Sequence, residues 1–178
     1  MQKYVALLRG INVGGNKKVP MADLKKCLEK LDFKNIKTLL NSGNVVFEGA
    51  KSDEKKLIKK LEAALEEKFN FTVPVILRTA EEIEKLIKTD PFQNIHVDKN
   101  TRLYITFLAE KSTSAMGIPY ESSKKEFRIL EKTNRELFSI LQLSPSTKTT
   151  ELMSIIEKEF GKNVTTRNWN TVLKIAEL

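Results

Sequence analysis

The sequence predicts an α+β fold, with a ferredoxin-like βαββαβ N-terminal half packed on a second α/β half. Three observations predict it. Short apolar runs alternate with amphipathic helical patterns over the first 78 residues, the second half repeats these ingredients, and 40% hydrophobic residues in a chain of 178 suffice for a substantial core. We therefore expect a ferredoxin-like α/β sandwich at residues 1–78 and an α+β subdomain with a C-terminal helix at residues 79–178.

The first half contains six elements that its periodicities identify. Apolar residues recur every three or four positions after Pro20, which indicates an amphipathic helix, whereas an unbroken apolar run is typical of a buried strand. In chain order we expect a strand at Lys3–Leu8, a helix from Met21 to Leu31, a hairpin of Thr38–Leu40 and Val45–Phe47, a helix from Ser52 or Asp53 to Phe69, and a strand at Thr72–Arg78.

The second half begins with a helix at Thr79, because Thr79 and Glu82 have the spacing of a capping box. Asp90-Pro91 ends that helix, since the residue before a proline disfavours helical backbone. After it we expect a strand at Arg102–Leu108, a polar connection over Ala109–Ser123, a hairpin of Glu126–Leu130 and Glu136–Leu141, a helix at Thr149–Phe160 closed by Gly161, and a last short helix from Asn168 or Asn170.

The composition excludes several classes of protein. One cysteine and one histidine exclude a disulfide scaffold, a cysteine-rich zinc site, an iron–sulfur site and a multi-histidine metal site, so we predict no metal and no cofactor. Met1–Arg9 enters a strand pattern without a charged leader or a cleavage signal, and no stretch approaches the roughly 20 apolar residues of a membrane span. We therefore expect a cytoplasmic protein with no membrane partner.

The net charge of +8 is concentrated at the front of the chain. Residues 1–47 carry nine Lys or Arg against three Asp or Glu. However, 25 of the 31 basic residues are lysines, many of them on amphipathic helices. That placement favours a solvated helix surface over a surface that follows phosphates.

The segment that follows the first strand, Arg9–Lys18, is rich in glycine, asparagine and lysine. Glycines between a strand and a helix let main-chain N–H groups converge on an anion, which Lys17 and Lys18 would neutralise. Asn16 stands where the phosphate-loop motif requires lysine, so the segment does not match that motif. A phosphate nest and a plain glycine-rich connection are both consistent with it.

Asn41-Ser42-Gly43-Asn44 is typical of a hairpin turn, because glycine and asparagine tolerate positive φ. In a βαββαβ unit the first two strands run in the same direction, so the loops that leave them lie at the same edge of the sheet. We therefore expect Gly10–Lys18 and Asn41–Asn44 to be neighbours at an edge rich in amides, glycines and cations.

Near the C-terminus, Thr165–Thr171 contains the only tryptophan together with Arg167. An asparagine-capped helix start with Trp169 in the core explains the asparagine and the tryptophan. Alternatively, Arg167 binds a phosphate or carboxylate, Trp169 stacks on a base, and the segment closes over the glycine-rich edge. Cys27 adjoins an apolar helix stripe and is interpreted as a small hydrophobe.

Four stretches lie in the order of a known family: Tyr4–Gly15, Val19–Met21, Ser42–Phe47 and Thr165–Val172. Together they resemble the bacterial domain-of-unknown-function family 1697. The resemblance implies a small cytoplasmic bacterial protein of ferredoxin-like α+β architecture, and it implies no reaction. Its signature positions coincide with the polar residues discussed above.

The candidate ligand-binding residues are Arg9, Gly10, Asn12, Gly14, Gly15, Lys17, Lys18, Ser42, Asn44, Arg167, Asn168 and Trp169. Their chemistry favours binding of a phosphate-bearing small molecule or a nucleic acid. One alternative is a structural or partner-binding protein with no ligand. Another is an enzyme acting on an anionic substrate, for which no general base is identifiable. No catalytic residue and no oligomeric state is assigned.

Overall fold

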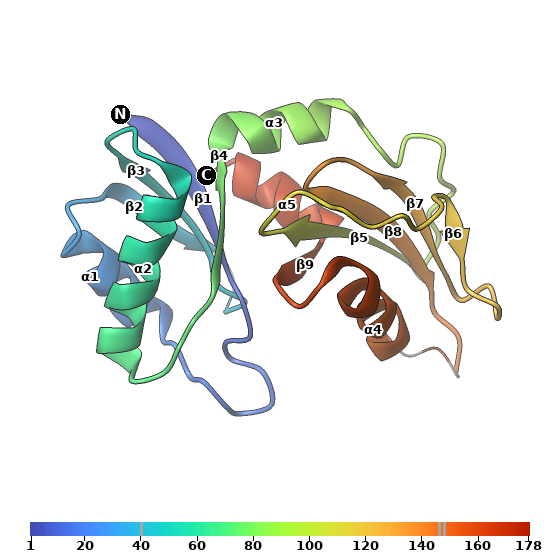
Figure 1. The fold of residues 1–178 in the computed structure, drawn as a ribbon, viewed down its shortest axis with the longest axis horizontal. Helices are drawn as coiled ribbons and strands as arrows, with labels where there is room; N and C mark the ends of the chain where they lie inside the picture. The colour runs from blue at the N-terminus through green and yellow to red at the C-terminus, as the bar shows by residue number, and fades with distance from the viewer. Residues whose placement is uncertain (40, 146, 148) are drawn as a thin grey trace. The chain divides into compact units, whose positions relative to one another are not determined.

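The computed structural model describes residues 1–39, 41–145, 147 and 149–178. Within these residues the chain is a mixed α+β protein with two antiparallel sheets and five helices (Figure 1). It divides into two compact units, one formed by Met1–Leu86 with Lys174–Leu178 and the other by Ile87–Leu173. The domain boundary expected between Arg78 and Thr79 stays a prediction.

The first unit contains all six elements expected in the first half of the chain. They are β1 (Gln2–Leu8), α1 (Met21–Glu29), β2 (Lys34–Leu39), β3 (Asn44–Gly49), α2 (Glu54–Phe69) and β4 (Val75–Thr79), followed by α3 (Ala80–Lys88). The strands form one antiparallel sheet in the order β2-β3-β1-β4, and α1 and α2 lie on one face of it (Figure 1). Leu40, expected at the end of the second strand, lies outside the described residues.

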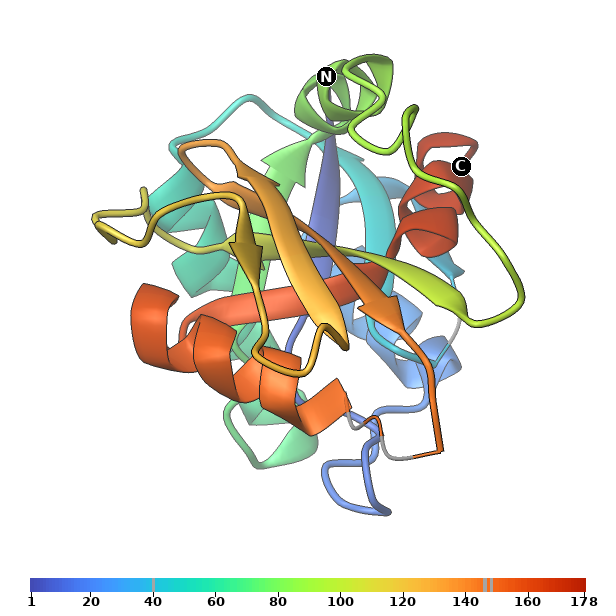
Figure 2. The same cartoon turned by 90° about the vertical axis from the view of Figure 1, so that its right-hand side faces the viewer.

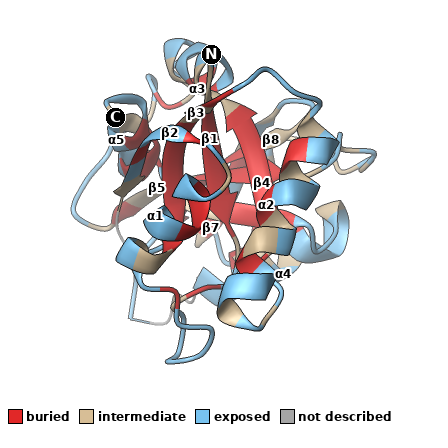
Figure 3. Cartoon of the chain, turned by 90° about the vertical axis from the view of Figure 1, so that its left-hand side faces the viewer, coloured by how far each residue is buried: buried red, intermediate tan, exposed pale blue. Residues whose placement is uncertain are grey.

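The core of this unit lies between the sheet and its two helices. Alternate residues of β1, namely Tyr4, Ala6 and Leu8, face a cluster that includes Leu24 of α1 and Leu61 of α2. Figure 3 shows the buried strands behind helices whose outer surfaces are exposed. The lysines of α1 and α2 fall mostly on those outer surfaces, as the amphipathic pattern predicts.

Side-chain caps lie at the starts of two helices. The Asp53 carboxylate accepts a hydrogen bond of 3.0 Å from the Lys56 N–H at the start of α2. Thr79 and Glu82 form the predicted capping box, in which the Thr79 N–H donates to Glu82 Oε2 at 2.7 Å and the Glu82 N–H donates to Thr79 Oγ1 at 3.1 Å. Side chains that satisfy free helical N–H groups thus fix both helix starts.

The second unit is built on a sheet in the order β6-β7-β8-β5-β9. Its strands are β5 (Thr101–Leu108), β6 (Tyr120–Glu121), β7 (Phe127–Lys132), β8 (Glu136–Gln142) and β9 (Val164–Asn168), and its helices are α4 (Thr149–Phe160) and the first part of α5 (Trp169–Ala176). Leu152 and Ile156 of α4 pack into the apolar cluster on the sheet, and Figure 2 shows this helix beside the strands. The predicted Thr149–Phe160 helix is confirmed.

Two strands of this sheet were not expected from the sequence. β6 lies inside the stretch predicted as a polar connection, and β9 precedes the last helix where only a helix start was expected. The sequence pattern does not predict β9, because Val164 is its one apolar residue. It is held instead by antiparallel pairing with β5 and by a 2.7 Å hydrogen bond between the Thr106 and Thr166 hydroxyls.

Two further findings concern function classes. Among the described residues, no helix is both long enough and apolar enough to cross a bilayer. Within the same residues, no group of three or more His, Cys, Asp or Glu side chains could hold a metal ion.

Candidate functional site: a polar edge of the first unit

The segment between β1 and α1 forms a short finger, residues Asn12–Lys17. Its base is closed by the Asn12 N–H, which donates to the Lys17 carbonyl at 3.1 Å, and its tip by the Asn16 N–H, which donates to the Val13 carbonyl at 3.1 Å. Gly14 and Gly15 at the tip have φ of +59° and +79°, which a two-residue hairpin turn of the primed type requires. Residues 13–18 are all exposed.

Asn12 ties the finger to the turn between β2 and β3. Its Oδ1 accepts from the Val19 N–H at 2.8 Å, and its Nδ2 donates to the carbonyls of Val19 at 3.0 Å and Asn41 at 2.7 Å. Asn12 itself has a φ of +56°, a conformation that asparagine tolerates better than most residues. The expectation that Gly10–Lys18 and Asn41–Asn44 are neighbours is therefore confirmed.

A main-chain hydrogen bond ties the Asn41–Asn44 turn to the end of β1. The Leu8 N–H donates to the Gly43 carbonyl at 2.8 Å. Asn44 is fully buried, and its Nδ2 donates to the Leu39 carbonyl at 3.0 Å and to Ser42 Oγ at 2.9 Å. Asn44 therefore stabilises the turn, whereas Asn41 and Ser42 are exposed at the same edge.

The cations of the edge differ in their surroundings. Lys17 Nζ donates to the Thr72 carbonyl at 3.1 Å and lies 5.7 Å from the centroid of the Phe71 ring, a cation–π contact. Lys18 is exposed, and Arg9 is partly buried with its N–H donating to the Pro74 carbonyl at 2.9 Å. One carboxylate lies close by, because the Thr72 hydroxyl donates to Glu66 Oε1 at 3.0 Å.

The loop that leads into β4, residues 70–74, belongs to this edge and was missed in the sequence. It supplies Phe71 and Thr72 to Lys17. A signal existed in the topology, because an antiparallel neighbour of β1 begins where β1 ends, and β4 is such a neighbour. We call the finger, the Asn41–Asn44 turn, Arg9, Gly10, Lys18 and this loop the polar edge.

The remaining candidates, Arg167, Asn168 and Trp169, lie in the second unit. Arg167 on β9 donates to Thr165 Oγ1 at 2.7 Å and to the Thr166 carbonyl at 2.9 Å, and burial lowers the pKa of its guanidinium to about 10, so it stays protonated at neutral pH. Trp169 is buried, with its ring edge-on to Phe92 at 5.3 Å. The tryptophan thus contributes to packing, and closure of this segment over the glycine-rich edge stays a prediction.

Comparison with known proteins identifies a family. The family model described as "protein of unknown function (DUF1697)" matches residues 1–138, so the chain belongs to that family. A solved structure, described as the conserved bacterial protein SP0830 from Streptococcus pneumoniae, is 25% identical over 99% of this chain and 97% of its own, with a TM-score of 0.73. Neither description names a ligand or a reaction.

A second solved structure, an unknown protein from Galdieria sulphuraria, is 17% identical over 94% of this chain and 98% of its own. Its TM-score of 0.26 is too low to relate the two folds. Comparison with curated proteins finds no match.

Proposed function

We propose that this protein binds a phosphate-bearing ligand, a small molecule or a nucleic acid, at the polar edge of its first unit. The observation that carries the proposal is the set of hydrogen bonds made by Asn12. Because these bonds join the finger to the Asn41–Asn44 turn, the exposed Lys17, Lys18 and Ser42 are held at one edge rather than on independent loops.

The main chain at the finger tip is open to a ligand. Around Gly14 and Gly15, nothing lies within 4 Å of the position that a Cβ atom would occupy. Both glycines are also exposed, so no side chain shields the main chain of the tip from an anion, and hydrogen bonds from N–H groups to an anion are stronger than neutral ones.

The two lysines of the edge supply the positive charge. The Lys17 ammonium has three donors and gives one to the Thr72 carbonyl, so it is positioned without being saturated. The Glu66 carboxylate, near the end of α2, opposes this positive charge, although it already accepts a hydrogen bond from the Thr72 hydroxyl. These features support an anion site that depends on several weak contacts and is sensitive to salt.

The proposal also includes the fold type of the first unit and the cellular location. The strand order β2-β3-β1-β4, with helices after β1 and β3, supports the ferredoxin-like assignment of the first unit. The single cysteine is consistent with the cytoplasm as the place of action.

The proposal is tested by nuclear magnetic resonance titration of the labelled chain with pyrophosphate and, separately, with a short single-stranded oligonucleotide at low and moderate salt. We expect amide shifts confined to the polar edge, residues 9–18, 41–44 and 70–73, and weaker binding at the higher salt. The two probes distinguish a small phosphate ligand from a polymer.

Lys17→Ala and Lys18→Ala should each weaken binding several-fold, because each removes one charged contact. Lys26→Ala is the matched control, since Lys26 is an exposed lysine of the same unit on α1. Shifts that cluster elsewhere, or equal losses in all three variants, would reject the polar edge as the site.

A further inference from the structure

The outer edge of β2 is a second surface that offers main-chain hydrogen-bonding groups. β2 pairs with β3 and stands last in the strand order, so within the described part of the chain no strand covers its other edge. A pocket of about 620 Å³ lies along it, which we call the β2 groove. Its lining residues are Lys3, Lys25, Glu29, Phe33, Asn35, Ile36, Lys37, Glu48 and Leu178.

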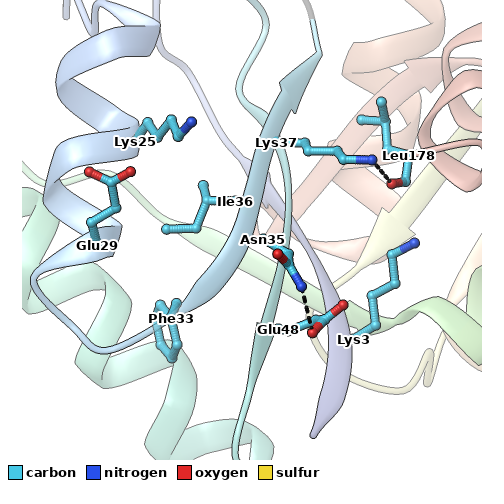
Figure 4. A pocket seen from close by; sticks show the side chains of 9 residues that line it. All are labelled: Lys3, Lys25, Glu29, Phe33, Asn35, Ile36, Lys37, Glu48 and Leu178. Atoms are coloured by element: carbon cyan, nitrogen blue, oxygen red, sulfur yellow. Dashed lines mark hydrogen bonds between the residues drawn. The ribbon is translucent and has the colours of Figure 1, made fainter.

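The groove borders β2 on both faces of the sheet. Figure 4 shows Lys25, Glu29 and Ile36 on one side of the strand, and Lys37, Lys3 and Leu178 on the other. This arrangement follows from the alternation of side chains along a strand, which sends Ile36 toward the helices and Lys37 to the opposite face. An added strand would therefore find side-chain contacts on both of its own faces.

The charges of the groove favour an acidic occupant. The side chains of Lys3 and Lys25 make no hydrogen bond or ion pair with any described residue, and Lys37 Nζ donates to the Leu178 main-chain oxygen at 2.6 Å. Of the two carboxylates, Glu48 already accepts from Asn35 Nδ2 at 2.9 Å. The lining thus carries three ammonium groups against two side-chain carboxylates, and the groups without such a partner are Lys3, Lys25 and Glu29.

We propose that the β2 groove binds an extended acidic peptide of another protein, which adds to the sheet as a strand beside β2. The main-chain groups at an open sheet edge supply the hydrogen bonds, as in other cases of strand addition. Lys3 and Lys37 would pair with acidic side chains on one face, and Phe33 and Ile36 would contact apolar side chains on the other. The sequence expected of the partner alternates acidic and apolar residues.

The same lysines disfavour a second copy of this chain as the occupant. Two β2 strands placed edge to edge would bring Lys34 and Lys37 of each copy together, and like charges on neighbouring strands are destabilising. The groove therefore discriminates by charge, accepting an acidic strand and repelling its own.

Fluorescence polarisation with a capped peptide as long as β2, alternating glutamate and valine, tests the proposal. We expect saturable binding, and we expect the same peptide N-methylated at every residue not to bind, because it lacks main-chain donors. Hydrogen exchange should slow at the amides of Lys34–Leu39 when the unmodified peptide is bound. Absence of binding, or equal binding of the N-methylated peptide, would overturn the proposal.

Charge reversal locates the peptide. Lys37→Glu should weaken binding about tenfold, since it replaces an attraction by a repulsion, and should create binding of a lysine–valine peptide. Lys26→Glu, on the exposed surface of α1 outside the groove, is the matched control and should leave binding unchanged. Lys3→Glu, on the same face of the sheet as Lys37, is the second test variant if Lys37→Glu lowers the melting temperature.

Equal effects of Lys37→Glu and Lys26→Glu would overturn the proposal by showing that binding follows net charge alone. Self-association of the free protein through β2, measured by sedimentation velocity, would overturn it in favour of a second copy. None of these results depends on phosphate binding at the polar edge.

Discussion

Gly43→Ala should be the most damaging single methyl group that can be added to the polar edge. Gly43 has a φ of +74°, where an L-residue with a side chain costs about 1–2 kcal/mol. A Cβ atom there would lie 2.7 Å from Leu8 Cβ and 2.8 Å from Ile11 Cδ1, and such overpacking costs about 1–3 kcal/mol. We expect the free energy of unfolding to fall by about 2–5 kcal/mol, a large part of the total for a domain.

Gly15→Ala is the matched control. Gly15 has a similar φ of +79°, but nothing lies within 4 Å of the added methyl group, so we expect a loss of only about 1–2 kcal/mol. Urea unfolding should be followed by circular dichroism, with Trp169 fluorescence reporting separately on the second unit. If Gly43→Ala costs no more than Gly15→Ala, the contacts assigned to Leu8 and Ile11 are wrong.

Three further changes test other parts of the structure. Asn12→Asp turns the donor that faces the Val19 and Asn41 carbonyls into an acceptor. The substitution should lower the free energy of unfolding, measured in urea, by about 1–3 kcal/mol and abolish pyrophosphate binding. Unchanged binding would contradict the role given to Asn12. Ser139→Ala removes a buried hydroxyl that has no hydrogen-bond partner among the described residues, so it should be neutral or stabilise by up to about 1 kcal/mol, and a clear loss would show a missed partner. Burial raises the pKa of the Cys27 thiol, so the stability gained from the neutral thiol is complete below the unfolded-state pKa of about 8.5 and is lost as the pH rises through the folded-state pKa. The difference in unfolding free energy between wild type and Cys27→Ala should therefore shrink over that pH range. A difference that stays constant with pH would contradict the raised pKa.

The helices and most strands could be predicted because their causes are local. The apolar period of α2 lies within one stretch of sequence, and the structure confirms the helix that it predicts and shows that Asp53 caps it. The capping box of α3 depends on two residues only three positions apart. Such signals can be read without knowledge of any tertiary contact.

β9 and the role of Asn44 could not be predicted in the same way. β9 has a single apolar residue and exists because β5 offers it a pairing edge across 56 or more residues of chain. Asn44 looked like a ligand-facing amide, yet it is buried and donates to the Leu39 carbonyl and Ser42 Oγ. In both cases the local sequence does not indicate which group the residue or strand bonds to in the folded chain.

The sequence by itself determined the α+β class, the family, the scarcity of metal ligands and the meeting of the finger with the Asn41–Asn44 turn. Periodicity, composition, short motifs and strand direction suffice for these, since all of them can be taken from the sequence without tertiary contacts. Only the tertiary structure decided that Asn12 joins the two loops while Asn44 is buried, and that the outer edge of β2 stays open between lysines. The reason is physical: two asparagines in similar turns have the same chemistry, and burial and hydrogen-bond geometry alone set their roles.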